Sequence, residues 1–386
     1  MVFQRFLGWQ ICVQNYIFLQ TYQLPQNTKC FKIAFILFLR YILVVFCSLN
    51  GIYDMIYVFT EIENYIGDNS LVSRWAVGFE LLSVHFSLIV LCWYSLFCTK
   101  QTVNFIQNNL SFSDDFVKVV GAQTKLRFRI WNICVVLHIL IIDFICTISF
   151  YYWQYENMID FFLCHRYLRN LVGIVILDLF YCYLIDFIEF YINCMTQLRK
   201  NLKKSSLFVF SSKFLKLIDK IIHLTKTFSE IFSLLLSSIL HHHFFEISII
   251  IYYVIRKIYQ DSQNKYRIQE IVTGCFWIYR SIFLAIYLCL KGHEFMNQSC
   301  RLISTVSQMI EYTSENQYKK RLFNKWHYSA KQISMRNLHE VNEITTKDFH
   351  RIDKTLIIRI ISATATFVLI LIQFKILEDN STVMKN

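Results

Sequence analysis

The chain has few of the residues that a soluble protein uses for tight turns and for contact with water. Its 386 residues include a single proline, Pro25, and only 8 glycines. Charged residues make up 17% of the chain, whereas soluble domains have about 25%. A soluble enzyme of this length would need more turn residues and more charge, so the composition argues against that class.

Apolar and aromatic residues are correspondingly abundant. Hydrophobic residues make up 55% of the sequence, with 36 Phe and 23 Tyr, which is the profile of a polytopic helical membrane protein. The net charge of +12 does not indicate nucleic acid as a partner, because the Lys and Arg residues lie between apolar blocks, as they do in membrane loops. The 13 cysteines form no CxxC pair and are expected to be small buried hydrophobes.

Long apolar segments predict an all-α protein that crosses the lipid bilayer several times. A spanning helix needs about 20 mostly apolar residues. Seven segments meet this requirement, and the fourth is the weakest because it holds several acidic residues. The segments run over residues 33–59, 76–99, 130–153, 168–192, 229–254, 270–290 and 356–377.

The distribution of basic residues predicts how these spans are oriented. Most Lys and Arg lie in the N-terminal segment and in the loops after the second, fourth and sixth spans, with RKNLKK at Arg199–Lys204 as the strongest signal. Because cytosolic loops are enriched in Lys and Arg, we expect a cytosolic N-terminus and an extracellular C-terminus. This orientation is opposite to that of a G-protein-coupled receptor. If the orientation were reversed, the chain would fit a metabotropic seven-span receptor that signals through a cytosolic partner. This is the alternative interpretation.

The spans and loops divide the chain into four expected parts. Residues 1–32 form a cytosolic N-terminal segment, and 33–290 hold the first six spans with an outer ligand pocket. Residues 291–354 form a cytosolic helical anchor, and 355–386 hold the last span and a short extracellular tail. The anchor loop is too long for a simple connection. RLISTVSQMIEY (residues 301–312) within it is typical of an amphipathic helix.

The last span carries a stripe of small and polar residues. On a helix, Ala363, Thr366, Ile370 and Gln373 share one face. Such a stripe has two physical uses. It can form a helix–helix seam, where small residues let backbones approach, or it can line a pore when several copies surround an axis. The pattern alone leaves both uses open.

The same segment resembles the C-terminal signature of insect gustatory receptors, which are related to insect odorant receptors. That signature is Thr-Tyr, five hydrophobic residues and Gln-Phe. Here Thr366, Phe367, Gln373 and Phe374 occupy the fixed places, with Phe367 instead of tyrosine. The resemblance implies a tastant-gated, non-selective cation channel in the plasma membrane of chemosensory neurons. It implies a tetramer with itself or with other gustatory receptor subunits, gated at Ile370, Gln373 and Thr366.

Three further residues bear on this resemblance. Val368 stands where sugar-sensing members have glutamate, so bitter or aversive compounds are the expected tastants. Arg359 lies on the same stripe at its inner end, where a ring of arginines would repel cations; pairing with Asp353 would relieve this. Asn380 begins a glycosylation sequon so close to the expected membrane that we expect it to be unused.

Polar and aromatic residues in the outer halves of the spans are candidates for a tastant pocket. Ionisable groups inside a membrane are functional candidates by default, and aromatic rings suit an amphipathic small molecule. A pair of Arg280 with Asp178 or Glu80 would be the purely structural alternative. The candidates are Glu80, His85, Tyr152, Trp153, Asp178, Trp277, Tyr279 and Arg280.

A run of histidines in the fifth span, LHHHFFE (Leu240–Glu246), raises the question of a metal site. Consecutive residues on a helix point about 100° apart, so we expect at most His242 and Glu246 to share a face. We therefore expect no metal site and no cofactor, and polar residues that bond one another inside the bundle. The sequence shows no nucleophile–base constellation, so we do not expect an enzyme.

Overall fold

The computed structural model describes most of the chain. It covers residues 70–120, 134–145, 161–204, 212–259, 267–315, 343–346 and 350–383, and isolated positions between 38 and 60, at 148 and between 328 and 335. Nearly all of these residues are helical. Within this part, two short antiparallel strands, β1 (Thr345–Thr346) and β2 (His350–Arg351), form a hairpin just before the last helix.

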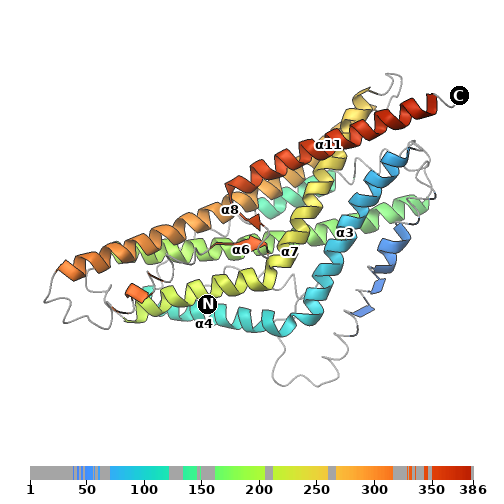
Figure 1. Cartoon of the computed structure of the whole chain (residues 1–386). Helices are drawn as coiled ribbons and strands as arrows, with labels where there is room; N and C mark the ends of the chain where they lie inside the picture. The colour runs from blue at the N-terminus through green and yellow to red at the C-terminus, as the bar shows by residue number, and fades with distance from the viewer. Residues whose placement is uncertain are drawn as a thin grey trace.

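Three very long helices form the body of the molecule (Figure 1). These are α6 (Phe161–Lys204), α7 (Ser212–Tyr259) and α8 (Arg267–Glu315). They have 44, 48 and 49 residues, so each is about 65–75 Å long at 1.5 Å per residue. A hydrocarbon core is only about 30 Å thick. Each helix therefore extends well beyond the membrane at one or both ends.

The expected spans lie in helices wherever the structure describes them in full. Five helices of the described part are long and apolar enough to cross a membrane, and they correspond to the second, fourth, fifth, sixth and seventh expected spans. The third expected span contains a shorter apolar helix, Cys134–Ile145. The first is described only at isolated positions, which are helical. The last span is α11 (Lys354–Val383).

The segment RLISTVSQMIEY is helical, as expected, but it is not a separate element. It is the C-terminal part of α8, which continues without a break from the sixth span to Glu315. Glycine and proline are absent between Gly292 and Glu315, so nothing in the local sequence ends the helix at the membrane boundary.

A helix that the sequence analysis missed connects the second and third spans. Helix α3 (Leu71–Phe97) ends at Cys98, and α4 (Thr99–Val120) begins directly afterwards. Phe105, Phe112 and Phe116 are buried on one face of α4. Their spacing of seven and four residues is that of an amphipathic helix. Because α4 also contains many polar residues, its sequence was interpreted as a loop.

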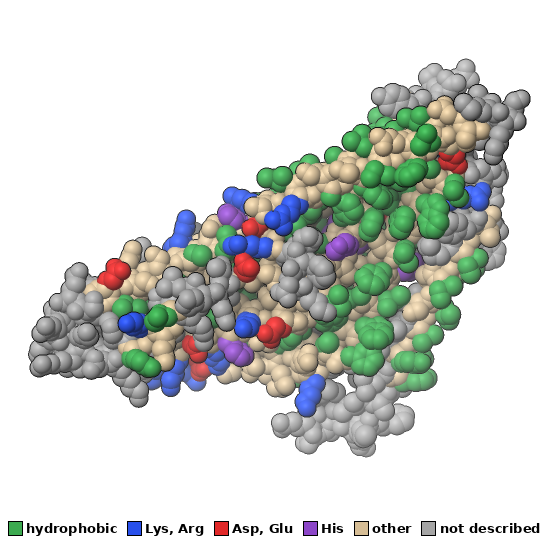
Figure 2. All heavy atoms as spheres, viewed as in Figure 1, with side chains coloured by type: hydrophobic (Ala, Val, Ile, Leu, Met, Phe, Trp, Pro, Cys, Tyr) green, Lys and Arg blue, Asp and Glu red, His purple; other side chains and the backbone are tan. Residues whose placement is uncertain are grey.

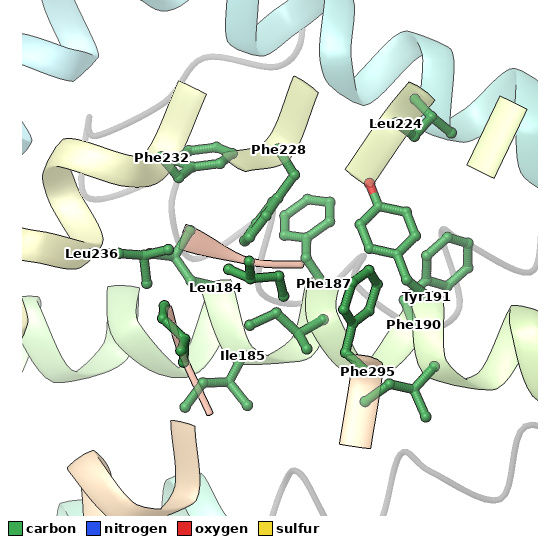
Figure 3. Packing of buried hydrophobic residues seen from close by; sticks show 14 of the residues in the cluster. Leu184, Ile185, Phe187, Phe190, Tyr191, Leu224, Phe228, Phe232, Leu236 and Phe295 are labelled. Carbon is green, nitrogen blue, oxygen red and sulfur yellow. The ribbon is translucent and has the colours of Figure 1, made fainter. Parts of the chain in front are cut away.

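An aromatic core holds α4, α6, α7 and α8 together (Figure 3). Phe187 of α6 lies 6.0 Å from Phe228 of α7, and Phe228 lies 5.2 Å from Phe232. The hydroxyl of Tyr191 donates a hydrogen bond to Asn109 of α4 at 2.9 Å. These side chains are fully or almost fully buried, so this end of the bundle is packed like the interior of a soluble protein.

The two halves of the molecule have different surfaces. Figure 2 shows hydrophobic side chains gathered over the half formed by α3, α11 and the adjacent part of α7, whereas most Lys, Arg, Asp and Glu gather over the other half. Large apolar side chains such as Trp75, Ile361 and Leu369 are exposed. An exposed apolar band of this kind fits the hydrocarbon region of a bilayer.

The hairpin before α11 is fixed against α8. The amide of Ile352 donates to the carbonyl of Ile344 at 3.0 Å, and a Cβ atom at Gly292 would overlap the carbonyl oxygen of Ile352. Glycine is therefore required where α8 meets the hairpin. Asp353 caps the N-terminus of α11, because its carboxylate accepts a hydrogen bond from the amide of Thr355 at 2.8 Å.

Candidate functional site

Helix α11 has one face buried in the subunit and another that is exposed. Thr364, Val368 and Leu371 are buried against the rest of the chain. The stripe predicted from sequence, with Thr366, Ile370 and Gln373, lies on the opposite face and is exposed. The stripe is therefore not a seam within the subunit. It is available to another chain, to lipid or to an aqueous path.

Other residues of the C-terminal signature have distinct environments. Phe367 is half-buried and lies 6.0 Å from Phe244 and 5.8 Å from Phe245 of α7. Phe374 is exposed. The hydroxyl of Thr366 donates to the carbonyl of Ser362 at 2.9 Å, which satisfies it within its own helix. Phe367 thus anchors α11 to α7.

Arg359 and Asp353, at the start of α11, have separate environments. Arg359 is exposed. Asp353 accepts hydrogen bonds from Thr355 and lies 3.5 Å from the guanidinium of Arg351. The carboxylate of Asp353 therefore caps the N-terminus of α11.

A groove of about 550 Å³ lies between α7, α8 and α11. Its lining is almost entirely aliphatic and includes Ile251, Ile286 and Ile361. None of the six tastant-pocket candidates that the structure describes lines it. The groove suits an acyl chain or another apolar group, and it lacks the polar groups that orient a specific ligand.

A network of charged residues lies inside the bundle around Arg280 of α8. Arg280 is fully buried. Its Nε atom lies 2.7 Å from Asp178 Oδ2 and 2.9 Å from Asp143 Oδ1, and its Nη1 atom donates to Glu246 Oε1 at 2.8 Å. One cation thereby joins α6, α7, α8 and the helix Cys134–Ile145. A buried arginine with several carboxylates is stable only as a complete set.

Two adjacent histidines border this network. His242 and His243 of α7 are both buried, with exposed fractions of 1%. His242 Nε2 lies 3.8 Å and His243 Nδ1 3.6 Å from the same oxygen, Glu246 Oε2. The expectation that only one of them could approach Glu246 is wrong, because positions three and four residues away both neighbour a helical residue. The group could hold a metal ion.

The structure brings together only some of the eight tastant-pocket candidates. Asp178, Trp277 and Arg280 form one group, with the Trp277 ring 4.9 Å from the guanidinium carbon. The pairing of Arg280 with Asp178 that was named from sequence is present. The Nη1 atom of Arg280 binds Glu246. The other described candidates lie elsewhere: Glu80 is half-buried, Tyr279 is exposed and bonds His138 at 2.9 Å, and His85 pairs with Asp54 at 2.8 Å. Tyr152 and Trp153 lie outside the described residues.

Sequence reasoning missed two members of the network. Asp143 lies in the third expected span and was not singled out, and Glu246 was considered only beside the histidines. A signal was present, because an arginine inside a span requires compensating acids in the neighbouring spans. Which acids approach it depends on helix rotation, and that is fixed by packing.

Comparison with known proteins supports the fold. The profile of a family described as 7tm Chemosensory receptor matches residues 5–378. The structure is similar to that of the insect olfactory receptor OR5 from Machilis hrabei in complex with eugenol, with a TM-score of 0.63 and 13% identity over 96% of this chain and 99% of that chain. A second structure of OR5 gives a TM-score of 0.61 and 12% identity over 97% and 99%. No curated protein sequence matches the chain.

The profile match extends over almost the whole chain, and the arrangement of helices agrees with that of a solved olfactory receptor. The resemblance of Thr366–Phe374 to insect gustatory receptors predicts the same grouping. The chain therefore belongs to the seven-transmembrane chemosensory receptor family.

Proposed function

We propose that this protein is a gustatory receptor subunit that forms a tastant-gated, non-selective cation channel. Four copies surround an axis, and α11 of each copy lines the pore. The observation that carries the proposal is the exposed stripe of Thr366, Ile370 and Gln373 on a helix whose opposite face is buried.

The physical argument begins with Gln373. An amide that faces hydrocarbon lacks hydrogen-bond partners, and this is costly. Gln373 is exposed on an otherwise strongly apolar helix. An aqueous path shared by several copies removes the cost, because water hydrates the amide. Ile370, one turn earlier on the same face, then forms an apolar ring that closes the path by dewetting.

The orientation proposed for the subunit places the N-terminus in the cytosol and the C-terminus outside. Basic residues between the spans support it. In this orientation the part of α8 beyond the sixth span lies in the proposed cytosolic anchor, residues 291–354. Gln373 then lies toward the extracellular end of α11. The protein functions at the plasma membrane of chemosensory neurons.

The proposed tastant is an amphipathic small molecule of the bitter or aversive type. The structure of OR5, which has a similar fold, was solved in complex with a small molecule, eugenol. Val368 is buried and lines the aliphatic groove, so the position where sugar-sensing members have glutamate is here in apolar surroundings. This supports a ligand other than a sugar.

The pore assignment is tested by electrical recording. Ile370→Ala should give a standing cation current without tastant, and Gln373→Ala should change conductance or ion selectivity. Ile361→Ala is the matched control. Ile361 is an exposed isoleucine nine residues away, and at 100° per residue it lies on the opposite side of α11. A silent Ile370→Ala channel at normal surface level would contradict the gate.

Tagging both termini on intact and permeabilised cells distinguishes the channel from a metabotropic receptor. A C-terminal tag that is accessible on intact cells, with a hidden N-terminal tag, is expected for the channel. The reverse pattern would place Gln373 at the cytosolic end and favour signalling through a cytosolic partner.

A further inference from the structure

The residues around Glu246 have unused coordinating capacity. The Nδ1 atom of His242 lies 3.1 Å from the hydroxyl of Ser83 on α3. Its other nitrogen, Nε2, has no hydrogen-bond partner among the residues that the structure describes, and it is directed at Glu246 Oε2, 3.8 Å away. Buried polar atoms are nearly always satisfied, so this nitrogen requires an explanation.

His243 has a related geometry. Its Nδ1 atom lies 3.6 Å from Glu246 Oε2 and 3.3 Å from the hydroxyl of Ser281. Its Nε2 atom also has no hydrogen-bond partner within the described part of the chain. Ligand atoms of His242, His243 and Glu246 all lie within 4.8 Å of one another. Two imidazoles and a carboxylate are thus gathered around one buried point.

The charges of the same region favour a cation. Arg280 contributes one positive charge, whereas Asp143, Asp178 and Glu246 contribute three negative charges when ionised. All four side chains are nearly inaccessible, so several acidic groups are concentrated in a poorly hydrated interior. Such an environment attracts a divalent cation.

We propose that His242, His243 and Glu246 form a binding site for a zinc ion inside the helix bundle. The ligand atoms are His242 Nε2, His243 Nδ1 and Glu246 Oε2, and the Ser281 hydroxyl or a water molecule occupies the fourth position. Two histidines and a glutamate are a common ligand set for Zn²⁺. The site is additional to the pore and to the proposed tastant pocket.

The distances fit this ion after small rotations. Tetrahedral ligands about 2.0–2.1 Å from zinc lie about 3.3–3.4 Å from one another, compared with 3.6 and 3.8 Å for the two histidines and Glu246. Arg280 does not block the site, because it binds Oε1. Oε2 accepts a hydrogen bond from the Ser281 hydroxyl, and the proposed ion would replace that hydrogen bond. Ser83 orients His242 by accepting from Nδ1–H, as partners of metal-binding histidines do.

The ion would link four helices through its ligands. Glu246 connects it to Arg280 of α8, and Arg280 connects it to Asp178 of α6. Ser83 connects it to α3. Because the folded state alone gathers these groups, zinc binding stabilises that state.

The test uses the full chain in lipid nanodiscs. After treatment with EDTA, the protein is equilibrated with Zn²⁺ and its metal content and melting temperature are measured. We expect about one zinc ion per chain and a higher melting temperature with zinc. His242→Ala and His243→Ala should each lose the ion and the thermal shift.

His241→Ala is the matched control, because His241 is in the same run but is exposed and bonds the carbonyl of Ser237. It should behave like the unsubstituted protein. If His242→Ala and His243→Ala fail to fold, Ser83→Ala tests the site without removing a ligand. It should weaken zinc affinity by about 10–100-fold. Absence of stoichiometric zinc from the unsubstituted protein would overturn the proposal. So would equal zinc uptake in folded His242→Ala or, if that variant does not fold, unchanged affinity in Ser83→Ala.

Discussion

Glu378, near the end of α11, caps the beginning of α3. Its carboxylate accepts the amide proton of Leu71 at 2.6 Å, and its second oxygen lies 3.5 Å from the amide of Val72. The first amides of a helix lack partners within the helix and carry a partial positive charge. A carboxylate from 307 residues away therefore joins the last helix to the second span.

Removal of this cap should weaken both helices. We expect Glu378→Ala to lower the free energy of unfolding by about 1 kcal/mol, the usual cost of losing a helix cap. Amide hydrogen exchange at Leu71 and Val72 should become faster, and this can be measured by mass spectrometry. Asp379→Asn is the control, since Asp379 is exposed and pairs with Lys375 in its own helix. Equal effects of the two variants would contradict a specific cap.

The second prediction concerns Arg280. Arg280→Met should destabilise the protein by about 3–5 kcal/mol, because it leaves three buried carboxylates without their cation. Thermal unfolding of the detergent-solubilised protein, followed by size-exclusion chromatography, measures this. Arg301→Met is the control on the same helix, at an exposed position. A melting temperature of Arg280→Met that equals that of Arg301→Met would show that the network carries little stability.

The third prediction concerns the contact between α8 and the hairpin. Gly292→Ala should displace the hairpin, since the new Cβ would overlap a backbone carbonyl of Ile352. A cost of about 1–3 kcal/mol is typical of such overpacking. In Gly274→Ala the new Cβ would meet only side-chain atoms of Val254 and Ile250, which can rotate. The difference in melting temperature between the two variants tests the assignment, and a larger loss for Gly274→Ala would contradict it.

The fourth prediction is a dependence on acid at the start of α11. Burial alone would raise the pKa of Asp353, but hydrogen bonds from Thr355 and Leu356 and the charge of Arg351 outweigh it and lower the pKa below 3.8. The stability that Asp353 contributes is therefore present above about pH 4 and is lost as the pH falls through the lowered pKa. Asp353→Asn should reduce the loss of melting temperature on acidification.

A control separates this effect from general acid denaturation. Asp115 of α4 is half-exposed and pairs with Lys220 of α7, so Asp115→Asn serves as the matched control for the loss of one carboxylate elsewhere in the chain. If Asp353→Asn showed the same acid dependence as the unsubstituted chain, the ionised carboxylate of Asp353 would not be the stabilising cap of α11.

The positions of the described spans could be predicted from the sequence because length and hydropathy are local properties. Their full lengths could not, because α6, α7 and α8 continue well beyond the apolar runs. Helix α4 was not predicted either, because its apolar stripe of Phe105, Phe112 and Phe116 is diluted by polar neighbours. The exposed face of α11 was predicted as a stripe, but only packing against α7 decides that the stripe faces away from the subunit.

The charge network could be anticipated only in part. An arginine in a span requires acids, and Asp178 was named as one. Asp143 and Glu246 come from helices whose rotation about their axes is set by packing against the rest of the chain, which no local pattern encodes. The two adjacent histidines show the same limit, because an angle of 100° between neighbours does not exclude convergence on a third side chain one turn away.

The unbroken length of α8 has a consequence for how distant parts of the receptor communicate. Arg280 and Glu315 belong to one helix and are separated by about 50 Å along its axis. No proline interrupts this stretch, so the helix contains no proline kink. A tilt of about 3° at Arg280 would move the far end by roughly 2.5 Å over that length. A small adjustment among buried charges is in this way enlarged into a larger displacement at the far end of the helix.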